Sequence, residues 1–122
     1  MRRSVLSLAL LALAGCASGP SVASASGPAG PDALDCALAE ATALGYAVAE
    51  AEAGVFFRAR QPKRFRRSRG TNDFDVVTAT AARGRLTVLA AGEQSTEDGV
   101  AAVDPSDDAE AEAAAIVAAC AG

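Results

Sequence analysis

The chain has 122 residues, a formal net charge of −4, three cysteines and no histidine or tryptophan. This length suits one domain, because a single core is typically built from about 100–150 residues. The missing histidine excludes Ser-His and Cys-His nucleophile pairs, histidine-ligated metals and the usual histidine pH switch.

The first sixteen residues carry a secretory pattern. Arg2 and Arg3 form a short basic region, and residues 5–14 are apolar apart from Ser7. Such a run is too short to cross a bilayer, which needs about 20 residues, but it has the length of a signal-peptide core. The run ends in Leu13-Ala14-Gly15-Cys16, which resembles the lipobox of bacterial lipoproteins.

The resemblance implies a lipid anchor. In that family residues 1–15 are a signal peptide, the Cys16 sulfur receives a diacylglyceryl group, and the new N-terminus is acylated, which holds the protein stably at a membrane of the cell envelope. Ala17 stands where Gram-negative lipoproteins retained at the inner membrane usually carry aspartate, so the resemblance implies the outer membrane in such a cell. The alternative is an ordinary signal peptide with a chance cysteine, which would leave one of three cysteines unpaired in an oxidising compartment.

Residues 17–31 have the composition of a linker. They read ASGPSVASASGPAGP, without charge and with a single sizeable apolar residue. We therefore expect residues 16–31 to be the lipidated cysteine and a disordered tether, followed by one small domain over residues 32–122. Fifteen such residues have an end-to-end distance of roughly 20 Å, so the domain would lie just off the membrane.

The domain is predicted to be α+β, with about four antiparallel strands flanked in sequence by an N-terminal and a C-terminal helix packed on one face of the sheet. The first helix begins at Asp32, a capping residue, and ends at Gly45. Its apolar face is formed by residues spaced three and four apart: Leu34, Leu38, Ala41 and Leu44.

Extended segments follow the first helix. The first begins at Tyr46 and ends in a turn at Ala53-Gly54, and Arg83-Gly84 marks a second tight turn. Further strands are predicted from alternating or β-branched stretches over residues 55–61, 74–81 and 86–91. Residues 92–104, which read GEQSTEDGVAAVD, have the composition of a loop.

A second helix is predicted from Asp104-Pro105-Ser106 to Ala121. Its first turns contain Asp107, Asp108, Glu110 and Glu112, which suit the positive end of a helix dipole. Its apolar face contains Ala113, Ile116, Val117 and Cys120.

Two cysteines remain once Cys16 is lipidated. Leu, Ile, Val and Phe make up only 18 of the 91 residues from Asp32 onward, so the core is small. A disulfide between Cys36 and Cys120, one in each helix, would close a loop of about 85 residues and add roughly 4–5 kcal/mol at most. A redox or metal role is disfavoured, because the pair is not a Cys-x-x-Cys and no histidine is present.

Basic residues are concentrated in one short stretch. Without Arg2 and Arg3 the chain has 15 acidic and 9 basic residues. Seven of the nine lie between residues 58 and 69, interleaved with phenylalanines: Arg58, Arg60, Lys63, Arg64, Arg66, Arg67 and Arg69. The cluster suggests an anion-binding surface for lipid head groups, lipopolysaccharide or an anionic polymer. The alternative is a solvated loop that pairs with the protein's own acids, and no nucleic-acid partner is expected for an exported protein.

Acidic pairs are the remaining candidates for chemistry. They occur at Glu50/Glu52, Asp73/Asp75, Asp107/Asp108 and Glu110/Glu112. Pairs two apart on a strand share a face, as in acid/base sites but also on any solvated sheet. No nucleophile or glycine-rich phosphate loop accompanies them, and Ser95-Thr96-Glu97-Asp98 lacks the spacing of a calcium loop.

These patterns favour a membrane-anchored envelope lipoprotein whose domain is non-enzymatic. We expect no catalytic residues, metal or cofactor, and a membrane attachment through the lipid. The expected partner of the domain is an envelope protein or an anionic surface, with an envelope enzyme using paired acids as the weakest alternative.

Overall fold

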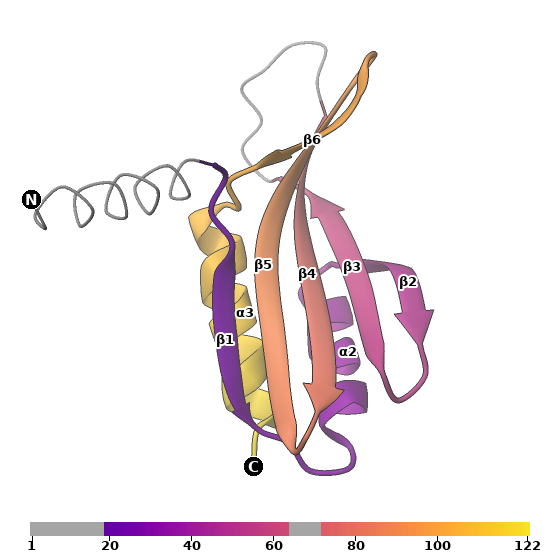
Figure 1. Cartoon of the computed structure of the whole chain (residues 1–122), viewed down its shortest axis with the longest axis vertical. Helices are drawn as coiled ribbons and strands as arrows, with labels where there is room; N and C mark the ends of the chain where they lie inside the picture. Colours follow the sequence, from indigo (N-terminus) through magenta and orange to yellow (C-terminus); the bar gives the residue numbers. More distant parts are fainter. Residues whose placement is uncertain (1–18, 64–71) are drawn as a thin grey trace, which may run out of the picture.

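The computed structural model describes residues 19–63 and 72–122 (Figure 1). In these residues the elements follow in the order β1 (Ala23–Pro28), α2 (Ala33–Ala43), β2 (Ala47–Glu52), β3 (Phe56–Pro62), β4 (Asn72–Ala82), β5 (Arg85–Thr96), β6 (Gly99–Val103) and α3 (Asp107–Cys120). The fold is α+β with one helix near each end of the sequence, as expected. The described part holds six strands, whereas about four were predicted.

The strands form one antiparallel sheet in the order β1-β5-β4-β3-β2, and β6 pairs with the far half of β5. Both helices lie on the same face, behind the sheet in Figure 1. The core is the single layer between the helices and the sheet, built from Phe57, Leu86, Ile116 and many alanines and valines. The opposite face of the sheet is covered by no helix of the described chain (Figure 1).

Helix α2 presents alanines, not leucines, to the core. Its buried residues are Ala33, Ala37 and Ala41, spaced four apart and therefore on one stripe. The expected face through Leu34, Leu38 and Leu44 is only half-buried. Small side chains at the contact let the helix axis approach the sheet closely, which displaces the larger leucines to the flank of the contact.

Strand β1 corrects the predicted tether. Residues 23–28 pair with β5, so that Ala25 lies opposite Val88 and Gly27 opposite Leu86. A Cβ added at Gly27 would lie 2.8 Å from the Ala121 side chain, so α3 packs directly against this strand. Its serine, glycine and alanine residues are typical of a linker. In this strand the small side chains leave room for a helix to pack closely.

The β5–β6 hairpin corrects the predicted loop at residues 92–104. Strand β5 continues to Thr96, and β6 pairs with its last five residues. The polar side chains of this segment are tolerated in a strand because most of the hairpin is exposed. Successive side chains point to opposite faces, and both faces of the hairpin are accessible to water.

Candidate functional site

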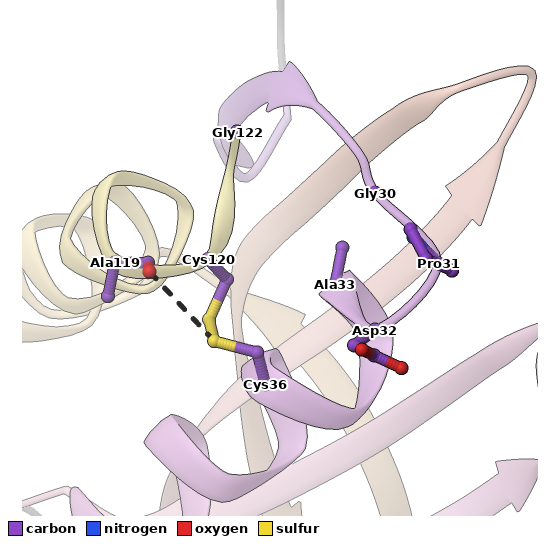
Figure 2. Close-up of a pocket in the computed structure, with 8 residues that line it drawn as sticks. All are labelled: Gly30, Pro31, Asp32, Ala33, Cys36, Ala119, Cys120 and Gly122. Atoms are coloured by element: carbon purple, nitrogen blue, oxygen red, sulfur yellow. Dashed lines mark hydrogen bonds between the residues drawn. A yellow bond between two sulfur atoms is a disulfide. The ribbon is translucent and has the colours of Figure 1, made fainter.

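The two helices are joined at the end of the domain where the chain terminates. The sulfur atoms of Cys36 and Cys120 lie 2.10 Å apart, with their Cα atoms 5.6 Å apart, so α2 and α3 run side by side as such a bridge requires. Cys36 Sγ lies 3.9 Å from the Ala119 carbonyl oxygen, the contact drawn as a dashed line in Figure 2. A bridged sulfur has no proton to donate, so this is a packing contact.

An open cavity of about 250 Å³ lies beside this disulfide (Figure 2). Asp32 is the one charged residue of its lining, which is Gly30, Pro31, Asp32, Ala33, Cys36, Ala119, Cys120 and Gly122. A wide hollow with one exposed carboxylate lacks the convergent polar groups that fix a ligand's orientation. We therefore assign the bridge a structural role.

Asp104 connects two distant segments at the opposite end of the domain. Its Oδ1 accepts hydrogen bonds from the Ser21 backbone N–H at 2.7 Å and from the Ser21 hydroxyl at 3.2 Å. Lys63 Nζ donates to the Asp104 carbonyl oxygen at 2.7 Å. The Ser21 backbone bond, then its hydroxyl, and the Lys63 charge lower the pKa of Asp104 below its ordinary value of 3.8, against a smaller opposing effect of desolvation.

This junction places Ser21, shortly before the first strand, beside Lys63, which directly follows β3. Ser21 lies five positions after Cys16, and Lys63 is followed by the four arginines of residues 64–69. The Lys63 N–H also donates to the Asp73 carbonyl oxygen at 2.8 Å, so the chain leaves β3 and re-enters β4 at this same end.

Two further members of the predicted anion-binding cluster lie on the uncovered face of the sheet. Arg58 on β3 forms an ion pair with Glu93 on β5, and the Arg60 guanidinium stacks over the Phe74 ring at 4.7 Å. Strand register puts Val76 on β4 between Arg58 and Glu93. Val76 is only 3% exposed although it is outside the core cluster, so these side chains shield it from water.

The predicted cluster is therefore divided. Its described members, Arg58, Arg60 and Lys63, each have a partner within the domain. Arg64, Arg66, Arg67 and Arg69 lie outside the described residues. The contacts with Glu93 and Asp104 were not predictable from the sequence, because they join residues 35 and 41 positions apart.

The acidic pairs separate into different roles. Asp75 is 4% exposed and accepts hydrogen bonds from the Ser106 backbone N–H at 2.9 Å and from its hydroxyl at 2.6 Å. Ser106 in turn caps α3 by accepting from the Ala109 N–H at 3.1 Å. Asp73 accepts from Gln94 at 3.1 Å, so the Asp73/Asp75 pair anchors structure.

The remaining acids split between surface and interior. Glu50 and Glu52 are exposed on β2. Asp107, Asp108 and Glu110 lie in the first turn of α3, as expected for dipole partners, whereas Glu112 is 8% exposed and faces inward. In residues 19–63 and 72–122, no group of three or more Cys, Asp and Glu side chains is placed to hold a metal ion.

No helix of the described chain has the length and apolar character needed to cross a membrane. Comparison with protein-family models and with curated proteins finds no match for this chain.

Proposed function

We propose that the protein is an envelope lipoprotein, anchored through acylated Cys16, whose α+β domain is a non-enzymatic binding module. The observation that carries the proposal is the Leu13-Ala14-Gly15-Cys16 motif at the end of a ten-residue apolar run. Strand β1 begins at Ala23, seven positions after Cys16. Seven residues span at most about 25 Å, so the domain is held close to the membrane surface.

The internal contacts support a binding role over catalysis. Asp75, Asp104 and Glu93 each hold two elements together. A carboxylate committed to such contacts is a poor acid or base for a bound substrate, since proton transfer would disrupt the fold. What the domain offers to a partner is surface: an uncovered sheet face and an exposed edge strand.

Replacing the lipidated cysteine tests the anchor. The Cys16→Ser variant should move from the membrane fraction to the soluble fraction, because no sulfur remains to carry the diacylglyceryl group. Metabolic labelling with a clickable fatty-acid analogue should tag the wild type and not this variant. Cys120→Ser is the matched control, and it should keep both label and membrane association. An unlabelled wild-type band contradicts the proposal.

A second candidate function is contact between the basic stretch and an anionic membrane. The Asp104 junction favours it, because Ser21 and Lys63 meet on one residue, so Lys63 lies beside the segment that leads to Cys16. Basic residues near an anionic leaflet contribute roughly 1 kcal/mol each. The lipid anchor and the basic stretch would then act together on one surface.

Vesicle co-sedimentation of the unlipidated chain tests this second function. Replacing Lys63, Arg64, Arg66, Arg67 and Arg69 with glutamine should abolish binding to phosphatidylglycerol vesicles at low salt. A matched pair refines the test: Arg66→Gln with Arg67→Gln should weaken binding more than Arg83→Gln with Arg85→Gln, at the β4–β5 turn. Equal binding by both pairs assigns the effect to net charge and contradicts a contact at this end.

A further inference from the structure

One edge of the sheet is uncovered by any other strand or helix in residues 19–63 and 72–122. Strand β2 is last in the strand order, and all six of its residues are exposed. Its neighbour β3 satisfies one side of its backbone, so the other side presents unpaired N–H and C=O groups that can template another strand. At the opposite edge, β1 has α3 packed against its face at Gly27, and its residues alternate between partly buried and exposed.

A hollow lies beside β2 on the helix side of the sheet. It has a volume of about 60 Å³, and its apolar lining includes Leu34 and Leu38 from α2 and Ala51 from β2, with the acidic residues Asp35 and Glu52 also at its wall. Val48, which faces the same side as the buried Ala59, is 48% exposed. A strand added along β2 would direct alternate side chains over these apolar groups, so small aliphatic residues fit there.

The other side of β2 is acidic. Glu50 lies opposite Arg58 and Glu52 opposite Phe56, so both carboxylates share the uncovered face. The neighbouring cations of β3 have partners farther into the sheet: Arg58 pairs with Glu93 on β5, and Arg60, opposite Ala47, lies over Phe74 on β4. The outer side of β2 therefore carries the charge of the two glutamates. Basic side chains opposite them are favourable, since opposite charges on neighbouring strands attract.

These features also argue against pairing with a second copy. Antiparallel self-pairing would bring Glu50 and Glu52 of each chain near the same carboxylates of the other, and like charges across strands are destabilising. The register of β2 shifts between Val48 and Glu50. Bulges and charges of this kind keep an edge strand from pairing indiscriminately.

We propose that β2 binds an extended segment of a partner protein by strand addition, and that this segment alternates basic residues with small aliphatic ones. The basic residues face Glu50 and Glu52, and the aliphatic residues cover Val48 and the hollow beside Leu38. This inference rests on the proposed role as a binding module and adds to it the surface and the partner's chemistry.

Synthetic octapeptides test the pairing with the full-length lipidated chain in phosphatidylcholine nanodiscs. An alternating lysine–valine peptide should bind at least about tenfold more tightly than an alternating glutamate–valine peptide. A peptide with the four lysines and four valines in separate blocks should bind more weakly than the alternating one. Equal affinity for all three peptides overturns the proposal.

Backbone methylation separates strand addition from simple charge attraction. In an added strand, every second amide points toward the partner strand. N-methylation of one alternate set of amides should therefore abolish binding, and methylation of the other set should leave it unchanged. If the two methylated peptides bind alike, whether both are weakened or neither is, no strand forms on β2.

Charge variants locate the site on the protein. Glu50→Gln with Glu52→Gln should weaken binding of the lysine–valine peptide about fivefold. Glu97→Gln with Asp98→Asn, the same charge change at the β5–β6 turn, should leave it unchanged. Both double variants alter exposed side chains, so their melting temperatures should match the wild type. An equal loss of affinity in both overturns the assignment to β2.

Site-specific photo-crosslinking in the native envelope distinguishes failure of this inference from failure of the proposed function. A crosslinking residue at Ala49 in β2 should capture a protein, and the captured segment should show the alternating pattern. Capture from Val100 in β6 alone overturns the β2 site and leaves the binding module standing. Capture from neither position overturns both.

Discussion

Asp75 shows how one carboxylate can determine where a helix begins. It lies in the interior of β4 and receives both the N–H and the hydroxyl of Ser106, the capping residue of α3. The cap is therefore doubly fixed, by its own helix and by the sheet. A buried carboxylate that accepts two hydrogen bonds contributes more to the free energy of unfolding than an exposed capping residue does.

Asp75→Ala should lower the free energy of unfolding by about 2–3 kcal/mol, because both Ser106 donors lose their acceptor in a buried site. Asp73→Ala is the matched control on the same strand. It removes one half-buried hydrogen bond to Gln94 and should cost about 1 kcal/mol. Thermal or urea unfolding of the two variants measures the difference. Equal costs would show that Asp75 does not hold α3 in place.

Individual contacts were the least predictable level of the structure. The start of the last helix was predicted near Asp104-Pro105-Ser106, residues that are typical there, and the structure has the helix begin at Asp107 with Ser106 as its capping residue. Asp75 was expected only as half of an acidic pair on a strand, either in an acid/base site or on a solvated sheet face, since its partner Ser106 lies 31 positions away. The contact of Ser21 with Asp104 spans 83 positions, and no local pattern encodes it.

Among the elements, β1 differs most from the prediction, because a strand stands where a disordered tether was expected. The same small residues that give a linker its flexibility allow Val117 and Ala121 of α3 to approach the strand. The sheet therefore begins at Ala23, within the segment of residues 17–31 that was predicted to be a tether.

Gly27→Ala tests this packing. The added Cβ would lie 2.8 Å from the Ala121 Cβ and 3.3 Å from Val117 Cγ1, so α3 must shift, at a cost of about 1–3 kcal/mol. That exceeds the gain of about 0.4–1 kcal/mol from the stiffer unfolded chain. Ser24→Ala, on the exposed side of β1, should change stability by less than about 0.5 kcal/mol. A Gly27→Ala variant as stable as the wild type would restore the tether interpretation.

Periodicity explains which elements the sequence predicted. Both helices and the segments of β2 to β5 were anticipated, because their apolar residues recur at spacings of three to four or of two. The end of β5 reads GEQST and β6 reads GVAAV, and these segments are strands through pairing with each other. Strand β1 lacks bulky residues altogether. Tertiary contacts, absent from a single-sequence pattern, form these three segments.

At the scale of the whole molecule, a small core gives limited stability, and a disulfide that closes a long loop of the chain adds to it. Few large side chains are fully buried, and alanines fill much of the helix–sheet contact. The cysteines at positions 36 and 120 are separated by 84 residues, which include five of the six described strands. Restricting the unfolded chain over that length contributes about 4 kcal/mol, a large share of the stability of a domain this size.

The double substitution Cys36→Ser with Cys120→Ser should lower the free energy of unfolding by about 4 kcal/mol. Wild-type protein melted in reductant should behave like this variant, since both lack the bridge. Intact mass of the wild type should rise by about two daltons on reduction, one hydrogen for each sulfur. Titration of both thiols in the folded, non-reduced protein would contradict the bridge.

The same bridge has a consequence for proteolysis. A protease that cuts once between Cys36 and Cys120, for example after one of the basic residues from Lys63 to Arg69, yields two fragments that stay joined through sulfur. With the proposed acylation of Cys16, both fragments would remain attached to the lipid anchor and would separate only after reduction. A single cut between Cys16 and Cys36 has the opposite result, because no covalent link would then join the anchor to the domain. In the lipid-anchored protein that we propose, release from the membrane would therefore require a cut within the twenty residues from Cys16 to Asp35, and β1 pairs six of these residues with β5.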